Sequence, residues 1–269
     1  MNQFKSCTIS KLLWLSLIIL SVGCKKDTKE TYDAPPAINE LLPVFIGKET
    51  FYRLDSTIIA LSGTNRTPKL KKYLLKEVVS SIERDNLNQP YWKVDKYLNE
   101  DLEGNGSWFP AGFYFITYLN DRIIVTENNL RFIKLMRPLR NDFSWKGNIY
   151  LPDEPLKDYF INVFEFDNIE QNMKNWLYTY KSIGINDVLP NQLSIDNVTT
   201  VEQINENNIP EGFVFGSSTP FNGYASQEYA VEKYAKGKGL IYQELELWEY
   251  QNNKNETKGY RLKKWLVNQ

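Results

Sequence analysis

The stretch that decides the fold class runs from Phe113 to Met136 and reads FYFITYLNDRIIVTENNLRFIKLM. It contains three runs rich in aromatic and β-branched residues, which are the side chains enriched in β-strands. Two short turn segments separate these runs, Leu119–Asp121 and Glu127–Asn129. Their Asn and Asp residues tolerate the left-handed backbone that tight turns require. The stretch therefore predicts three consecutive antiparallel strands.

The chain on both sides of this stretch shows the same short apolar runs, separated by Asn, Asp, Gly and Pro. A short helix is expected at Asp167–Asn175 and a long loop at 205–223, which forms a flap or a disordered excursion. The fold class is mainly β, with antiparallel sheets and minor helix. The remaining strands are expected at Glu49–Ala60, Lys72–Ile82, Tyr91–Tyr97, Trp176–Ile183, Ser194–Ile204, Glu228–Ala235, Gly239–Trp248 and Tyr260–Leu266.

Two architectures fit these strands. One is a single sandwich-like or curved sheet, and the other is two related lobes at residues 44–150 and 151–269. The second option draws on a similarity between Tyr91–Tyr97 and Glu228–Tyr234, which share a Val-x-Lys-Tyr-like pattern. The sequence leaves both open.

The N-terminus has the features of a bacterial signal peptide. Lys5 and Lys11 precede an apolar run from Leu12 to Leu20. This run of about ten residues is too short to span a bilayer, for which about 20 are needed. Residues 1–23 are therefore expected to be removed.

The signal peptide ends in Ser21-Val22-Gly23-Cys24, which resembles the lipobox of bacterial lipoproteins. The resemblance implies that Cys24 becomes the N-terminus and carries lipid, including an acyl chain such as palmitate. Ser21 departs from the pattern, which usually has Leu at this place. Lys25 follows the cysteine where an inner-membrane retention signal would have Asp. We therefore expect an outer-membrane lipoprotein, with the periplasmic or surface face left open.

Residues 24–43 are polar and contain Pro35 and Pro36. Such a segment buries too little apolar surface to offset the entropy of ordering it. We interpret it as a flexible tether between the membrane and the folded chain.

Several segments resemble uncharacterised cell-envelope lipoproteins of the Bacteroidota. They are Leu130–Leu135 with Trp145 and Asn148 after it, Tyr234–Tyr242, and the start of the folded part from Leu42. The resemblance implies the envelope location and a β-rich fold, but these relatives bring no assigned activity.

Composition excludes several kinds of chemistry. The chain has no histidine, and its two cysteines are Cys7 in the leader and Cys24. The mature domain therefore lacks His-assisted nucleophiles, His/Cys zinc sites, His-ligated haem and disulfides. Loss of Lys5 and Lys11 with the leader changes the net charge from −1 to −3, which argues against a nucleic-acid partner. We expect no cofactor.

Carboxylates are the remaining candidates for catalysis. A glycan hydrolase would need two of them across a groove, but Glu244 and Glu246 are more typical of a solvated strand face. Asp101–Gly106 has the spacing of a calcium loop, but its twelfth position is Gly112 and not Glu, so we assign no metal. The candidates on or beside strands are Asp121, Glu127, Glu165, Asp167, Glu244, Glu246 and Glu249.

Aromatic side chains are the best candidates for a binding surface, because amphipathic rings contact glycans, peptides and proteins. We single out Trp108, Phe109, Phe113 and Trp145. The leading hypothesis is a non-catalytic envelope lipoprotein with a binding or structural role, whose partner is an envelope protein, a glycan or a lipid. The alternatives are a carboxylate-dependent glycan hydrolase and a carrier of a hydrophobic ligand.

Overall fold

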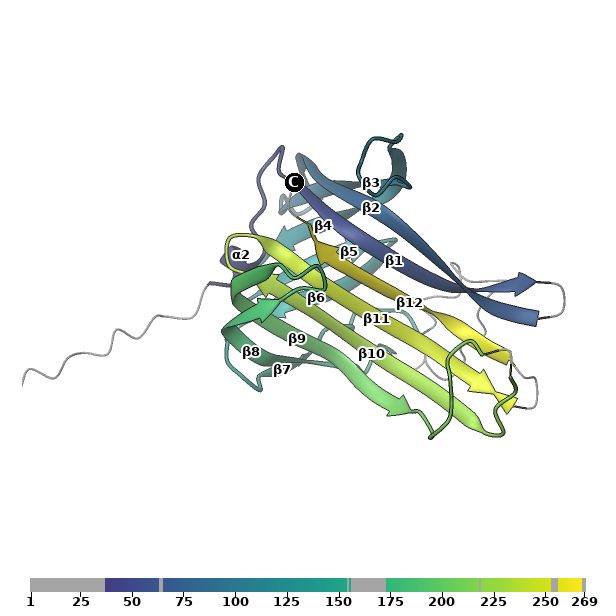
Figure 1. Ribbon diagram of the computed structural model, residues 1–269. Coiled ribbons are helices and arrows are strands. Elements are labelled where there is room, and N and C mark those ends of the chain that lie inside the picture. The colour runs from purple at the N-terminus through teal and green to yellow at the C-terminus, as the bar shows by residue number, and fades with distance from the viewer. Residues whose placement is uncertain are drawn as a thin grey trace, which may run out of the picture. The chain divides into compact units, whose positions relative to one another are not determined.

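The computed structural model describes residues 37–62, 65–153, 155, 173–217, 219–252 and 256–267 (Figure 1). The leader, Cys24 and most of the expected helix at Asp167–Asn175 lie outside these ranges. Among the described residues, no helix is both long and apolar enough to cross a membrane. The elements are α2 (Ile38–Leu41), β1 (Glu49–Ser62), β2 (Asn65–Arg84), β3 (Pro90–Asn99), β4 (Phe109–Tyr118), β5 (Arg122–Glu127), β6 (Leu130–Met136), β7 (Ser144–Lys146), β8 (Leu177–Val188), β9 (Ser194–Asn208), β10 (Tyr224–Ala235), β11 (Gly239–Gln251) and β12 (Glu256–Leu266).

The described strands form one antiparallel sheet in the order β6-β5-β4-β3-β2-β1-β12-β11-β10-β9-β8-β7. Apart from β6 and β7, strands that follow each other in the chain pair with each other, and β1 also pairs with β12. The outer edges, β6 and β7, approach each other where the Ile133 amide donates to the Gly147 carbonyl at 2.8 Å. The Trp145 indole N–H donates to the Ile133 carbonyl at 2.8 Å beside this bond. The sheet is therefore curved and nearly closed on itself (Figure 1).

The three-stranded meander predicted between Phe113 and Met136 is confirmed as β4, β5 and β6. Its first turn is closed by a 2.9 Å hydrogen bond from the Leu119 amide to the Arg122 carbonyl. In its second turn Asn128 and Asn129 have φ values of 52° and 61°. These are the left-handed conformations that Asn tolerates, so the turn residues set the pairing register.

The two halves of the chain supply the two halves of this sheet, which meet where β1 pairs with β12. The similar segments Tyr91–Tyr97 and Glu228–Tyr234 lie in β3 and β10, each third from this junction. In the first half the chain runs from β1 at the junction outward to β3, whereas in the second half it runs from β10 inward to β12 at the junction. Equivalent strands of a tandem repeat would have the same chain order, so the placement of these segments does not support duplication.

The main core lies inside the curve of the sheet. One buried cluster contains Val79, Val94 and Ile116 from one half together with Val201 and Leu247 from the other. Burial of apolar surface contributes about 25 cal/mol per Å². The two halves therefore stabilise each other through contacts between residues that are far apart in the chain.

The segment around α2 is packed, although the sequence analysis placed it in the tether. Ile38 and Leu41 are 3% and 0% exposed. The Tyr118 hydroxyl donates to the Leu42 carbonyl, and the Lys48 ammonium donates to the carbonyls of Pro43 and Lys238, both at 2.8 Å. The apolar residues of this short segment find a surface to bury against, which its polar composition did not reveal.

The loop expected at 205–223 begins later, because β9 extends to Asn208. Its phenylalanines pack onto β11: the Phe213 ring is stacked on Trp248 with centroids 5.5 Å apart. The Phe221 amide and carbonyl both bond the Tyr250 hydroxyl at 2.9 Å. The described part of the loop is therefore held against the sheet by an aromatic cluster.

Candidate ligand-binding cavity

A cavity of about 420 Å³ lies inside the curve of the sheet. Its walls come from strands β1 to β6 and β10 to β12, with Leu42 added from the segment after α2. Residues from both halves of the chain face it because β1 and β12 join the halves into one curved surface. Volumes of about 300–1,000 Å³ are typical of small-molecule sites.

Aliphatic side chains make up much of the cavity wall. Eight leucines line it, and Ile116 and Val125 add to the same surface. Leucine and its relatives have no polar group to offer a ligand, so this part of the wall suits a hydrocarbon group. The leucines include Leu54, Leu75, Leu98, Leu245 and Leu262.

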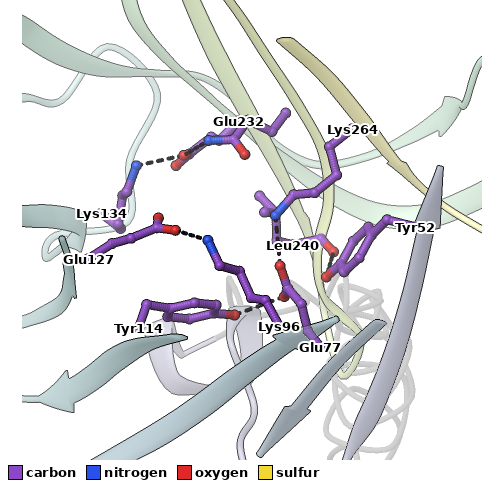
Figure 2. A network of polar contacts seen from close by, with 10 residues as sticks. Tyr52, Glu77, Lys96, Tyr114, Glu127, Lys134, Glu232, Leu240 and Lys264 are labelled. Atoms are coloured by element: carbon purple, nitrogen blue, oxygen red, sulfur yellow. Dashed lines mark hydrogen bonds and ion pairs between the residues drawn. The ribbon is translucent and has the colours of Figure 1, made fainter. Parts of the chain in front are cut away.

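Charged side chains also face the cavity, and they are paired (Figure 2). Three lysine–glutamate pairs bridge strands that are not neighbours in the sheet. They balance three positive charges with three negative ones, as buried charges require. The pairs are Lys264–Glu77 at 3.0 Å, Lys134–Glu232 at 2.6 Å, and Lys96–Glu127.

Glu77 on β2 is bonded through both of its oxygens. The Lys264 ammonium donates to Oε1 at 3.0 Å and the Tyr114 hydroxyl donates to Oε2 at 2.8 Å. The Lys264 ammonium also lies 4.7 Å from the centre of the Tyr52 ring. Tyr52 donates its own proton to the Leu240 carbonyl at 2.9 Å (Figure 2).

Glu232 on β10 is the most deeply buried of these carboxylates, at 2% exposed. Lys134 at 2.6 Å and the Gln243 amide at 3.0 Å both donate to its Oε1. The Tyr234 hydroxyl donates to its Oε2 at 2.7 Å. Three donors from three strands therefore fix this carboxylate.

Burial and these partners determine the charge states of Glu232 and Tyr114 in the cavity wall. Burial alone would raise the pKa of Glu232, but Lys134, Tyr234 and the more distant charge of Lys264 bring it below its ordinary value. Burial, and then the charge of Glu77, raises the pKa of Tyr114 well above its ordinary value. At neutral pH the cavity therefore contains a charged Glu232 and a protonated Tyr114.

The candidate pair Glu244 and Glu246 has the arrangement of a strand face bearing salt bridges. Glu244 pairs with Lys263 at 2.7 Å and Glu246 pairs with Arg261 at 2.6 Å, both across the β11–β12 ladder. The cationic partners are each 41% exposed. The two glutamate side chains are only 14% and 8% exposed, so they are ion-paired but largely covered, and not solvated as the sequence suggested.

The other candidate carboxylates also have partners where the structure describes them. Asp121 pairs with Arg122 at 2.8 Å, and Glu249 accepts from the Gln251 amide at 2.9 Å. Glu127 faces the cavity through its pair with Lys96. Glu165 and Asp167 lie outside the described residues.

Glu228 on β10 is a carboxyl group that the sequence analysis did not select. Burial, and then the charge of Glu206, raises the pKa of Glu228 to about 7. A neutral carboxyl can act as an acid, but it can also be a structural consequence of burial.

The Asp101–Gly106 segment is a turn. The Gly104 amide donates to the Asp101 carbonyl at 3.0 Å, and Gly104 has φ of 82°. The Asp101 carboxylate accepts from the Glu103 amide at 2.9 Å. Within the ranges that the structure describes, no three acidic side chains come close enough to bind a metal ion together.

The four aromatic candidates do not share one environment. Phe109 and Phe113 on β4 are 57% and 47% exposed. Trp108 precedes them, with the Lys76 ammonium 4.9 Å from its ring centre. Trp145 is only 5% exposed and packs on Tyr180, with centroids 4.7 Å apart. A binding role for the exposed pair stays a prediction, whereas Trp145 lies in the core at the β6–β7 seam.

The cavity lysines and glutamates were not selected from the sequence, apart from Glu127. Each sits in a strand where a charged residue usually indicates a solvated face. Lys263 and Lys264 illustrate the difficulty, because the first pairs with Glu244 across the ladder and the second faces the cavity. Alternation places Lys264 on the same face as Leu262, but it does not show that this face encloses a cavity.

Comparisons with known proteins give little further information. No protein-family model matches the chain, and no curated protein matches it. One similar solved structure is that of a protein from Bacteroides fragilis described as exported and as having a YmcC-like fold. It covers 84% of this chain and 96% of its own, with 12% sequence identity and a TM-score of 0.33.

Proposed function

We propose that this protein is a non-catalytic lipoprotein of the cell envelope that binds a small molecule with a hydrocarbon part inside the curved sheet. The observation that carries the proposal is the cavity of about 420 Å³ with its leucine-rich wall. A filled interior would instead have favoured binding through the outer surface. Of the three roles considered from the sequence, carriage of a hydrophobic ligand fits this cavity best.

The polar side of the cavity supports binding without catalysis. Each of its three carboxylates is bonded to a lysine. Those of Glu77 and Glu232 are further held by tyrosine hydroxyls. Groups held in this way orient a ligand and set its polarity, which is the usual role of the few polar groups in a ligand pocket.

The location rests on the first 24 residues. The leader and the Ser21–Cys24 motif support export and acylation of Cys24, and the residues after it support the outer membrane. Metabolic labelling with a palmitate analogue tests this, by comparison of the natural chain with Cys24→Ala. Label in the natural chain alone is expected, and equal label in both would contradict the anchor.

Binding is tested with the mature Cys24→Ala chain, residues 24–269, which lacks both the apolar leader and the acylated cysteine, and with the neutral hydrophobic dye Nile red. Saturable binding is expected, with fluorescence enhancement on uptake. Leu98→Trp fills the cavity, because Leu98 lines it. The matched control is Leu87→Trp, in a turn where the leucine is 88% exposed.

The expected result is a loss of dye affinity of about tenfold or more in Leu98→Trp and none in Leu87→Trp. If Leu98→Trp does not fold, as judged by its circular dichroism, Ala111→Phe fills the cavity from β4 instead. Equal dye affinity in the folded cavity variant and the control would overturn the proposed function.

A further inference from the structure

We propose that the cavity selects amphiphiles with an anionic headgroup, such as a carboxylate or a phosphate, and that Lys134 and Lys264 bind this headgroup. The inference rests on the proposed function and adds to it the charge and position of the ligand's head. Both lysines line the cavity, on β6 and β12 (Figure 2).

The exposed fractions of the side chains in the Lys134–Glu232 and Lys264–Glu77 pairs favour an anionic ligand. In the Lys134–Glu232 pair the lysine side chain is 13% exposed and the glutamate 3%. In the Lys264–Glu77 pair the values are 11% and 7%. In each pair the carboxylate side chain is therefore the more covered partner and the lysine side chain the more accessible one.

Hydrogen bonding favours an anion as well. Both oxygens of Glu77 and both oxygens of Glu232 already accept hydrogen bonds. In the described part of the chain, Lys134 and Lys264 each donate one, to these carboxylates. An ammonium group has three N–H bonds. A carboxylate or phosphate can accept the remaining ones without displacing either glutamate.

Both ammonium groups interact with the Glu232 carboxylate. Lys134 is bonded to Glu232, and the charge of Lys264 also contributes to the lowered pKa of Glu232. Figure 2 shows the two lysines on either side of this glutamate. A headgroup that contacts both ammonium groups from the cavity side, with Glu232 in place, interacts with two positive charges, and this compensates for its loss of water.

The leucine-rich wall next to these lysines requires the rest of the ligand to be apolar. Leu245 and Leu262 lie on the strands that also carry Gln243 and Lys264, and all four face the cavity. A free inorganic anion would leave this wall in contact with water. The ligand class is therefore an amphiphile and not a small anion.

The test compares ligands that share a straight ten-carbon chain and differ in the headgroup, with displacement of Nile red from the Cys24→Ala protein as the readout. The probes are decanoate, decyl phosphate, 1-decanol and decyltrimethylammonium, with acetate and inorganic phosphate as heads without a chain. We expect both anionic amphiphiles to bind about tenfold or more tightly than the neutral and cationic ones. Acetate and phosphate should not displace the dye.

Equal or tighter binding of 1-decanol or decyltrimethylammonium would overturn the inference and leave the proposed function standing. Displacement by acetate or inorganic phosphate at the concentrations effective for decanoate would also overturn it, in favour of a small-anion site. Failure of all four ten-carbon compounds would overturn the proposed function itself.

A double substitution, Lys134→Gln with Glu232→Gln, tests the lysine without leaving an unpaired buried charge. The readout is the ratio of the decanoate and 1-decanol affinities, which a general loosening of the cavity would change little. We expect this ratio to fall about tenfold. The control is Lys263→Gln, whose ammonium pairs with Glu244 and is 41% exposed. An unchanged ratio in the double variant would refute the role of Lys134.

Discussion

Replacement of Lys264 by methionine should destabilise the fold strongly, although it removes only one charge. The Lys264 and Glu77 side chains are 11% and 7% exposed, and their charged atoms are 3.0 Å apart. The variant leaves the Glu77 carboxylate buried without its cation. Breaking a buried pair in this way costs about 3–5 kcal/mol, mostly because one charge remains uncompensated.

The surface pair Lys174–Asp153 provides the matched control. It has a similar separation of 3.2 Å, but its side chains are 44% and 89% exposed. Solvent screens such a pair, and Lys174→Met should cost less than about 1 kcal/mol. In a domain of this size 1 kcal/mol corresponds to about 2–4 °C in Tm, so the expected losses are about 6–20 °C against less than about 4 °C.

A second variant separates charge from packing. Glu77→Gln combined with Lys264→Met removes both charges and keeps an acceptor for the Tyr114 hydroxyl, so most of the stability should return. Thermal unfolding followed by circular dichroism measures all variants. If Lys264→Met and Lys174→Met lower Tm equally, or if the double variant is no better than Lys264→Met, the cavity pair is not a buried ion pair.

Three further predictions concern other parts of the molecule. The raised pKa of Glu228, about 7 against an ordinary 4.5, means that the folded state binds more protons between these values. Stability should therefore fall as pH rises through this window, and Glu228→Gln should flatten the dependence of Tm between pH 5 and pH 8. Gly259 has φ of +125°, and an added Cβ would lie 2.2 Å from a backbone oxygen of β11, whereas Gly212 has φ of +81° with nothing within 4 Å. Gly259→Ala should therefore lower the free energy of unfolding by more than Gly212→Ala, for which backbone strain alone costs about 1–3 kcal/mol. Chemical denaturation measures both losses, and equal losses would contradict the close approach. Phe213→Ala removes a ring stacked on Trp248 and should lower the free energy of unfolding by about 1–3 kcal/mol. The variant should also be cleaved faster in this loop by limited proteolysis, and unchanged cleavage would contradict the packing of the loop.

The local parts of the fold could be predicted from the sequence because local residues determine them. Asn128 and Asn129 set a tight turn, and the strands on both sides begin and end within a residue of the predicted limits. β7 was missed because Ser144–Lys146 is only three residues long and has no alternation to recognise. The pairing of β1 with β12, which unites the two halves, depends on residues about 200 positions apart, and no local pattern specifies it.

The cavity escaped prediction for a related reason. Lys134 and Glu232 are 98 positions apart, and each by itself has the appearance of a solvated residue on a half-buried strand. Only the curvature of the sheet puts them face to face. Among the aromatic candidates, Trp145 fills the seam between β6 and β7 and does not line an exposed surface, which its sequence context did not indicate.

The most direct test of the central claim is a crystal structure of the Cys24→Ala protein grown with decanoate. We expect the hydrocarbon chain among the leucines inside the curved sheet, with the carboxylate within hydrogen-bonding distance of Lys134 and Lys264. Decanoate bound solely to the outer face of the sheet, with the interior unchanged, would contradict it.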